Sequence, residues 1–305
     1  MSGIRIGTRG SKLALWQAEW VAGELQQLGY SVELIVITTQ GDTSTLSLSQ
    51  VGGQGLFTKE IQRELLAGRV DVAVHSLKDL PTIPIEGLSL AAVPLRETTA
   101  DCLISRGGEE FEALPSGASV GTGSSRRGAQ LRAWRPDIEI ADIRGNVDSR
   151  LKKLQEKQYD AIVLAAAGLQ RLGLTEHITQ RLPEERMLPA VGQGALGLEC
   201  RSDDSVTAEA LRELDHFASH AAVAAERSLL KSLLAGCLAP VAALGQVDGQ
   251  QLKLRGRVIS LDGQQVLESQ VTGSAEHAVA LGEQLAEQLR DQGAAEVIER
   301  ARLQM

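Results

Sequence analysis

Short apolar runs alternate with segments of helical periodicity through the first two thirds of the chain. The β-branched and apolar runs predict strands at residues 4–6, 32–38, 70–74, 88–93, 101–105, 118–121, 138–143 and 161–165. Apolar positions at helical spacing predict helices at residues 11–28, 57–67, 124–134 and 147–158. Such alternation is typical of α/β domains with largely parallel sheets.

The last third has a different pattern. After an Ala-rich helix at 218–234, two Asp-Gly turns separate apolar runs and predict an antiparallel sheet of strands 241–247, 252–259 and 266–271, followed by a helix at 275–292. The turn Gly192-Gln193-Gly194 indicates a return crossing, so residues 195–200 are expected to pair back into the first sheet. We therefore expect three domains: residues 1–95 with 193–214, residues 96–192 and residues 215–305.

Composition and charge exclude several classes of protein. Apolar residues make up 43 % of the 305 residues and the formal net charge is −8, so large-scale disorder is not expected. An acidic chain with 3 % aromatic residues lacks the basic face and stacking rings of a nucleic-acid binder. We find no targeting signal, and the longest apolar run, 161–169, is about half a membrane span. A cytoplasmic protein, or a mature one whose leader was removed, is expected.

Arginines recur where predicted strands give way to helices. Arg9 follows the first strand, Arg126 and Arg127 open a helix after Ser124-Ser125, and Arg144 precedes Gly145, with Arg150 one helical turn later. The carboxyl ends of parallel strands line one crevice, and helix N-termini with guanidinium groups bind carboxylates or phosphates. This pattern indicates an anion site, and the alternative is a set of solvated surface arginines. As a nucleotide motif, Gly121 to Ser125 is weak because the full Gly-x-Gly-x-x-Gly spacing is missing.

The segment His75-Ser76-Leu77-Lys78-Asp79-Leu80-Pro81 gathers polar side chains at the end of a predicted strand. A carboxylate there can transfer a proton or stabilise a developing cation, while Ser76 and Lys78 would hold an anionic substrate. The alternative is a capped turn in which Asp79 ends the strand without a chemical role.

The three cysteines, Cys102, Cys200 and Cys237, include no Cys-x-x-Cys pair, so a disulfide scaffold and a cysteine zinc site are both improbable. Cys102 and Cys200 lie in apolar strands and are expected in the core. Cys237 lies between Gly236 and Pro240, on a constrained loop after the Ala-rich helix. It is either an inert small residue or a point of covalent attachment.

Taken together, these segments resemble the porphobilinogen deaminase family, whose members are also called hydroxymethylbilane synthases. The matching stretches occur in the family's order along the whole chain: Thr8-Arg9-Gly10-Ser11, 13–18, Gly41-Asp42, 52–57, 75–81, 124–127, 144–147, 188–195 and Gly236-Cys237. Each stretch is modest evidence, but the ordered set is very specific.

The resemblance implies a transferase of tetrapyrrole synthesis. It would join four porphobilinogen molecules head to tail into hydroxymethylbilane, with release of ammonia, on a dipyrromethane cofactor tied by a thioether to Cys237. It also implies a monomer whose fold is two hinged α/β domains, like those of type II periplasmic binding proteins, with a small C-terminal α+β domain. Each pyrrole carries acetate and propionate groups, which would account for arginines at successive turns.

The resemblance also assigns roles to single residues. It makes Asp79 the catalytic residue, which would stabilise the cation left when ammonia departs. Residues implied to bind the cofactor are Cys237, Ser76, Lys78, Asp79, Thr122, Ser124, Arg126, Arg127, Arg144 and Gly145. Residues implied to bind the substrate are Arg9, Ser11, Arg144, Arg150, Arg171 and Gln193. The Gly-, Ser- and Thr-rich stretch before residue 57 lacks periodicity, and its part from 43 to 57 would form a lid.

Two departures from the family pattern leave alternatives open. Gln50 and Gln54 stand where the lid usually carries lysines, and Leu238-Ala239 follow the cysteine in place of Gln-Val. A slowly turning paralogue that binds the precursor is therefore one alternative. Another is a non-catalytic module that binds or senses a small carboxylate with the same cleft, since one fold hosts both functions.

Overall fold

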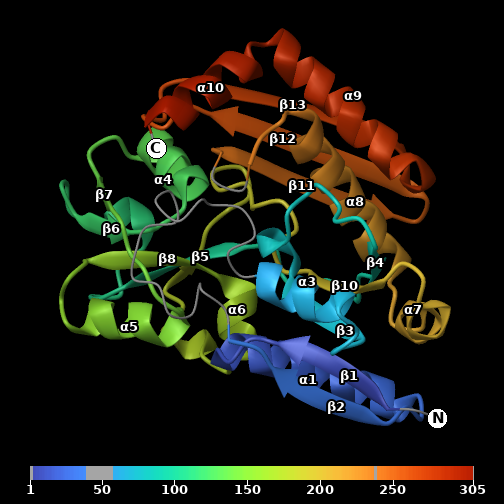
Figure 1. The fold of residues 1–305 in the computed structure, drawn as a ribbon. Coiled ribbons are helices and arrows are strands. Elements are labelled where there is room, and N and C mark those ends of the chain that lie inside the picture. Colours follow the sequence, from blue (N-terminus) through green and yellow to red (C-terminus); the bar gives the residue numbers. More distant parts are fainter. Residues whose placement is uncertain (1–2, 39–57, 237–238, 305) are drawn as a thin grey trace.

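Three β-sheets, two of five strands and one of three, organise the residues that the computed structural model describes, namely 3–38, 58–236 and 239–304 (Figure 1). Each large sheet with its helices forms one lobe, and the small sheet with its helices forms a third unit. The fold class expected from the sequence, two α/β units with a small α+β unit, is confirmed. The exact domain boundaries stay predictions.

The first lobe is built on a sheet with the strand order β2-β1-β3-β10-β4. Its strands are β1 (Ile4–Thr8), β2 (Val32–Val36), β3 (Val72–Ser76), β4 (Leu88–Ala92) and β10 (Leu196–Arg201). Its helices are α1 (Lys12–Gln27), α3 (Lys59–Leu66) and α7 (Ser205–Arg212). Strands β1, β2 and β3 are parallel, whereas β10 is antiparallel to β3 and β4. The predicted return of residues 195–200 to the first sheet is thereby confirmed.

The second lobe repeats this plan with the order β7-β6-β8-β5-β9. Its strands are β5 (Asp101–Ser105), β6 (Ser119–Gly121), β7 (Glu139–Ala141), β8 (Ala161–Ala165) and β9 (Gln180–Arg181). Its helices are α4 (Ser125–Trp134), α5 (Val147–Gln155) and α6 (Ala166–Arg171). Strands β6, β7 and β8 are parallel and β5 is antiparallel to β8. The parallel strands of both lobes thus deliver their following turns to one edge, where ligands of α/β sheets bind.

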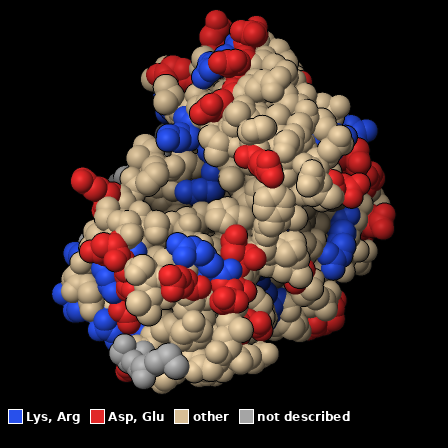
Figure 2. Space-filling model, turned by 90° about the vertical axis from the view of Figure 1, so that its right-hand side faces the viewer, with Lys and Arg blue, Asp and Glu red and all other residues tan. Residues whose placement is uncertain are grey.

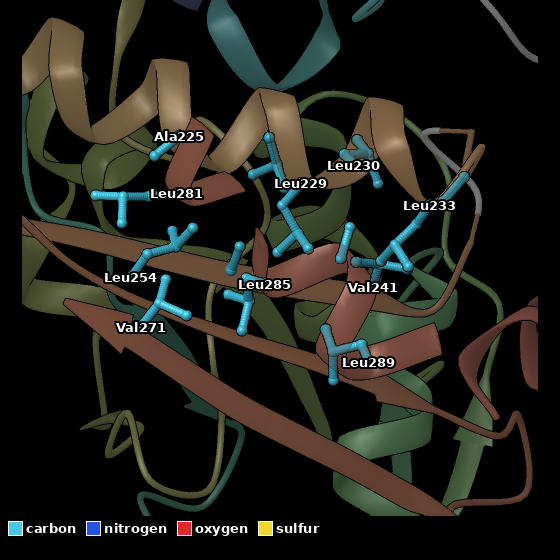
Figure 3. Close-up of a cluster of buried hydrophobic side chains, with 14 of the residues drawn as sticks. Ala225, Leu229, Leu230, Leu233, Val241, Leu254, Val271, Leu281, Leu285 and Leu289 are labelled. Atoms are coloured by element: carbon cyan, nitrogen blue, oxygen red, sulfur yellow. The ribbon is translucent and has the colours of Figure 1, made fainter. Parts of the chain in front are cut away.

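The small unit packs three helices against an antiparallel sheet. The sheet holds β11 (Val241–Asp248), β12 (Gln251–Ile259) and β13 (Val266–Ser274), and the helices are α8 (Phe217–Ser232), α9 (Ala278–Asp291) and α10 (Ala294–Gln304). Figure 3 shows Leu229 of α8 and Leu285 and Leu289 of α9 pointing into one apolar cluster with Leu254 of β12. This burial of apolar surface is what lets the small unit form its own core.

Local sequence explains where the helices around the cleft begin. The hydroxyl of Ser11 accepts the N–H of Ala14 and begins α1, and that of Ser124 accepts the N–H of Arg127 and begins α4. The side chain of Asn146 caps α5 in the same way. The helix predicted at 275–292 is a 3₁₀ turn followed by α9, and the pattern did not predict α6, α7, β9 or α10. The loop predicted at residues 39–55 lies outside the described residues.

Two crossing segments, residues 93–100 and 182–195, connect the lobes and bond to each other. The N–H of Glu97 donates to Gly194 O at 3.2 Å, and Arg96 Nε donates to Gln193 O at 2.8 Å. Gly194 has a φ of +84°, and a Cβ there would lie 2.4 Å from Glu97 O and 2.6 Å from Thr98 O. Only glycine therefore allows the two crossings to lie this close.

We expect Gly194→Ala to lower the free energy of unfolding by about 3 kcal/mol, because it combines a left-handed backbone with a main-chain clash. Urea denaturation monitored by circular dichroism measures the change. Gly173→Ala is the matched control, since Gly173 has a φ of +68° and a Cβ at that position would meet nothing within 4 Å, and it should lose only about 1 kcal/mol. Equal losses in the two variants would contradict the close-approach explanation.

Candidate functional site

A cavity lies where the three units meet. Its wall includes Lys78 and Leu80 from the turn after β3, Arg126 from the start of α4, and Arg227 from α8. Gly236 and Ala239, which flank the loop expected to carry Cys237, also line it. Cys237 itself and the expected lid at 43–57, with Gln50 and Gln54, lie outside the described residues. Three of the segments singled out in the sequence, 75–81, 124–127 and the loop that begins at Gly236, therefore contribute residues to one cavity.

The turn that carries Asp79 is held firmly at its base. Strand β3 ends at Ser76 and continues into a 3₁₀ turn over Leu77–Asp79, closed by the N–H of Leu80 donating to Leu77 O at 3.1 Å. Leu77 is buried, so it anchors the turn, while the Asp79 side chain is exposed beside the cavity. Ser76 Oγ lies 2.8 Å from Gln17 Nε2 of α1, which ties the strand end to the first helix.

His75, the first residue of the motif, points into the lobe rather than into the cavity. It is buried, and its Nε2 lies 2.8 Å from Glu199 Oε2 of β10. Gln62 of α3 donates to the same Glu199 oxygen at 2.9 Å. His75 thus belongs to a buried polar contact next to the turn that carries Asp79.

Arg126 and Arg127 are buried around a single carboxylate. Arg126 Nη1 lies 2.8 Å from Asp101 Oδ2, and Arg127 Nη2 lies 2.7 Å from Asp101 Oδ1. Asp101 is 0 % exposed and the two arginines are 4 % and 6 % exposed. Burial alone would raise the pKa of Asp101, but the two guanidinium charges outweigh it and hold that pKa well below its usual range. The alternative of solvated surface arginines is therefore wrong for this pair.

The cavity wall offers cationic groups that suit a carboxylate-bearing ligand. The Nε–H of Arg126 is buried and has no hydrogen-bond partner in the part of the chain that the structure describes. Burial lowers the pKa of Lys78 to about 8, although the nearby Asp79 charge opposes this. A buried donor without an acceptor is rare in folded proteins and points to a group that binds there. These residues fit the acidic side chains of a pyrrole cofactor.

Three other arginines extend this positive region. Arg144 Nε donates to Asp142 Oδ2 at 2.9 Å, and Arg150 Nε donates to Gly145 O at 2.8 Å. Burial lowers the pKa of Arg150 to about 10, the charges of Arg127 and Arg144 lower it further, and that of Asp79 opposes them. Arg9 is half-buried at the start of α1. The charges of Arg127, Arg144 and Asp79 are therefore close enough to Arg150 to influence its pKa.

Some expected ligands have other partners in this structure. Arg171 Nη2 donates to Gly194 O at 2.7 Å and its guanidinium lies over the Trp16 ring, while burial lowers its pKa to about 10. The Gln193 amide is buried and donates to Thr99 O at 2.7 Å and to Asp101 at 2.9 Å.

Hydroxyl groups near the cleft are also engaged. The Ser11 and Ser124 hydroxyls cap their helices, and Thr122 Oγ1 accepts the N–H of Ser124 at 3.2 Å. Gly145 has a φ of +110°, as a turn there requires. Direct contact of these side chains with cofactor or substrate stays a prediction.

Sequence reasoning missed Asp101, Glu226 and Arg227. Asp101 was treated only as the start of an apolar strand, although a charge directly before Cys102-Leu103-Ile104 marks a residue that needs a buried partner. Glu226 and Arg227 are adjacent charges within an Ala- and Leu-rich helix, which is a similar signal. Both signals were present in the sequence, but neither identifies the partner.

Two family models cover most of the chain. "Porphobilinogen deaminase, dipyromethane cofactor binding domain" matches residues 4–209, and "Porphobilinogen deaminase, C-terminal domain" matches residues 220–291. The chain belongs to the porphobilinogen deaminase family. A porphobilinogen deaminase of Desulforudis audaxviator is 50 % identical over 302 residues, covering 98 % of both chains. One of Trichlorobacter lovleyi is 50 % identical over 299 residues, covering 97 % of this chain and 96 % of the relative.

Solved structures of binding proteins match part of the chain at low sequence identity. A putative methionine-binding lipoprotein of Bacillus subtilis is 14 % identical with a TM-score of 0.43, covering 70 % of this chain and 89 % of its own. A periplasmic substrate-binding protein of an ABC transporter from Coxiella burnetii is 13 % identical with a TM-score of 0.44, covering 69 % and 91 %. The assignment of this chain to the deaminase family depends on the family models and the deaminase relatives.

Among the described residues, no group of three or more His, Cys, Asp or Glu side chains could hold a metal ion. None of the described helices is long and apolar enough to cross a membrane. Figure 2 shows acidic and basic side chains intermixed on the face that it draws.

The lowered pKa of Lys78 predicts a pH-dependent stability. The pKa of Lys78 is about 8 in the folded chain and 10.5 ordinarily, so between these pH values the unfolded chain binds more protons than the folded one. The free-energy cost of burying the charged lysine therefore decreases as the pH rises. In a Cys237→Ser background, which removes the expected point of covalent attachment, Lys78→Met should be more stable than its parent at pH 7. The difference should shrink by pH 10 in urea denaturation. A difference that stays constant from pH 7 to pH 10 would contradict the lowered pKa.

Proposed function

We propose that the cavity between the three units carries out the reaction of the deaminase family with the residues that line it. As a member of that family, the chain is a tetrapyrrole-pathway transferase that joins four porphobilinogen molecules into hydroxymethylbilane and releases ammonia. The observation that carries the assignment of the site is the convergence on one cavity of the Asp79 turn, the buried Arg126 and both flanks of the Cys237 loop. The alternative of a non-catalytic carboxylate sensor has no support from the comparisons.

The residues present suit a dipyrromethane group attached to Cys237. Arg126 Nε, Lys78 and the N-terminus of α4 would hold its acetate and propionate groups. When bound, that group supplies the pyrrole ring to which the first substrate is joined. Arg127 is held by Asp101 and Val163 O, so it adds positive charge to this wall from a fixed position.

Asp79 is placed to stabilise positive charge. The amino group of porphobilinogen is first protonated. When the C–N bond then breaks, the bonding electron pair leaves with the nitrogen as ammonia, and a methylene-pyrrole cation remains. An ionised carboxylate close to that cation lowers its energy, and it does so most where water is excluded. Lys78 and Leu80, the neighbours of Asp79, line the cavity, and the turn is closed by a main-chain bond. The protein can therefore supply this negative charge without reorganising.

Arg144, Arg150 and Arg9 are proposed to bind the carboxylates of the incoming substrate and of the growing chain. Their half-buried positions leave the guanidinium groups able to exchange partners, unlike the buried Arg126 and Arg127. The resemblance also implies a monomer in the cytoplasm, and we include both in the proposal. Light scattering on the purified protein tests the monomer.

The proposed attachment predicts a mass change. Intact-protein mass spectrometry of the active protein should show the sequence mass plus that of two linked pyrroles. The Cys237→Ser variant should have the bare mass, while Cys200→Ser, which removes a buried thiol of β10, should keep the addition. A bare mass in an active wild-type preparation would rule out a covalent cofactor.

The role of Asp79 predicts a loss of turnover without a loss of fold. Because the side chain is exposed, Asp79→Asn should unfold at nearly the wild-type temperature and keep the attached pyrroles. Its kcat for ammonia release from porphobilinogen should fall by about 100-fold or more, since a preorganised charge is lost. Asp148→Asn, which removes a carboxylate from α5 that pairs with Lys12, is the control and should be close to wild type. Near-normal turnover by Asp79→Asn would reject its catalytic role.

A further inference from the structure

Arg227 of α8 joins the small unit to the turn that carries Asp79. Its Nη1 donates to Leu80 O at 2.9 Å and its Nη2 donates to Pro81 O at 2.7 Å. Leu80 and Pro81 directly follow Asp79, whereas α8 belongs to a different unit of the fold. In Figure 1, α8 lies between β11 of the small unit and the first lobe. A half-buried guanidinium therefore crosses the boundary between the two units.

The turn needs these two bonds. Pro81 has no N–H, and the N–H of Leu80 is already used in closing the turn on Leu77. The carbonyl oxygens of Leu80 and Pro81 accept the two bonds from Arg227, and main-chain carbonyl groups away from water need such donors. One planar guanidinium donates to both carbonyl oxygens from two nitrogen atoms whose separation is fixed. It therefore sets the position and the direction of the chain immediately after Asp79.

The helix that provides Arg227 is itself fixed. The preceding residue, Glu226, is 0 % exposed and accepts bonds from Arg96 Nη1 at 2.6 Å and from the N–H of Gly192 at 2.7 Å. Helix α8 ends at Ser232. Gly236, which follows the helix shortly afterwards in the chain, lines the same cavity as Leu80. One rigid helix thus contacts the chain after Asp79 and leads into the loop of Cys237.

We propose that Arg227 is a positioning residue that sets the Asp79 carboxylate relative to the cavity between the three units. This proposal depends on the role of Asp79 given under the proposed function. Arg227 acts through the main chain of Leu80 and Pro81 rather than on the reacting atoms. Through it, helix α8 fixes the position of the turn that carries Asp79 against the small unit.

Other contacts keep the small unit docked when Arg227 is changed. Arg257 of β12 donates to Gln130 Oε1 of α4 at 2.8 Å and to Glu185 O at 2.8 Å. Arg132 of α4 donates to Leu261 O at 3.0 Å. Together with Glu226 these bonds join the small unit to the second lobe and to the crossings. Loss of the Arg227 bonds should therefore displace the Asp79 turn without releasing the domain.

The test compares Arg227→Gln and Arg227→Lys with the wild-type holoenzyme. Arg227→Gln should carry the attached pyrroles by intact mass and lose between 10- and 100-fold in kcat with little change in KM, because small misplacements of a catalytic group reduce the rate steeply. Arg227→Lys can donate to one of the two carbonyl oxygens but not to both in a fixed geometry, so it should recover part of the lost kcat. A kcat within twofold of wild type for either variant would overturn the proposal. If Arg227→Gln does not fold, Arg227→Lys alone decides.

Arg135→Gln is the matched control. Arg135 also donates to main-chain carbonyls, those of Phe111, Glu112 and Leu114, but it lies at the end of α4 opposite to the cavity. The Arg135→Gln variant should lower the unfolding temperature by an amount similar to that for Arg227→Gln and should leave kcat unchanged. If the kcat of Arg135→Gln falls as far as that of Arg227→Gln, the effect is a general loss of stability and the proposal is wrong.

A double variant separates this proposal from the proposed function. If Arg227 acts through Asp79, adding Arg227→Gln to Asp79→Asn should reduce the residual kcat no further. A further 10-fold loss would show that Arg227 acts by another route and would overturn the positioning role. If Asp79→Asn itself turns over normally, the proposed function of Asp79 fails instead. An Arg227→Gln protein without the attached pyrroles would show that Arg227 serves attachment, which also overturns the proposal.

Discussion

The buried carboxylate of Glu226 is the contact on which the arrangement of the three units depends. It accepts bonds from Arg96 of the first crossing, from the N–H of Gly192 in the second crossing and from the N–H of Gly245 in β11. A fully buried carboxylate is stable only when such donors surround it, and removing one partner of a buried pair typically costs about 3–5 kcal/mol. The crossings and the small unit therefore have one low-energy arrangement, and the cavity forms at the place where they meet.

A second buried carboxylate explains how an acidic chain maintains a cationic cleft. The formal net charge of −8 describes the whole sequence, but the charged residues that line the cavity are Lys78, Arg126 and Arg227. Asp101 pairs with Arg126 and with the neighbouring Arg127. Asp101 neutralises one of the two buried arginines, so the burial of adjacent like charges becomes tolerable while a positive excess remains. The overall charge excluded nucleic acid as a partner, yet it gave no information about the sign of the cleft.

Much of the fold could be predicted from local patterns. The strands expected at 101–105 and 161–165 match β5 and β8, and the serines before two of the predicted helices do cap them. Short elements such as α6, with six residues, and β9, with two, are not predicted because so few residues cannot show a helical or strand periodicity of apolar positions. The motif around Asp79 and the arginines at helix starts could be singled out as candidates because the polar residues of each group are adjacent in the sequence.

The remainder of the site could not be predicted because it depends on pairs that are distant in the sequence. Asp101 meets Arg126 and Arg127 only after the second sheet has formed, and Arg227 meets Leu80 and Pro81 across 147 and 146 positions. A spacing rule identifies residues on one helix face or at one strand end, but it does not identify the partner of a lone charge in an apolar element.

These long-range pairs also differ from the exposed charges in what they do. Surface ion pairs such as Lys12 with Asp148 contribute little to stability, because water competes for both groups. The buried ones at Asp101 and Glu226 have no such competitor, so their geometry is rigid. A turn that carries an exposed carboxylate on a rigid support would keep its charge in place while successive substrates enter and leave. That combination of fixed support and accessible charge is what the proposed chemistry requires.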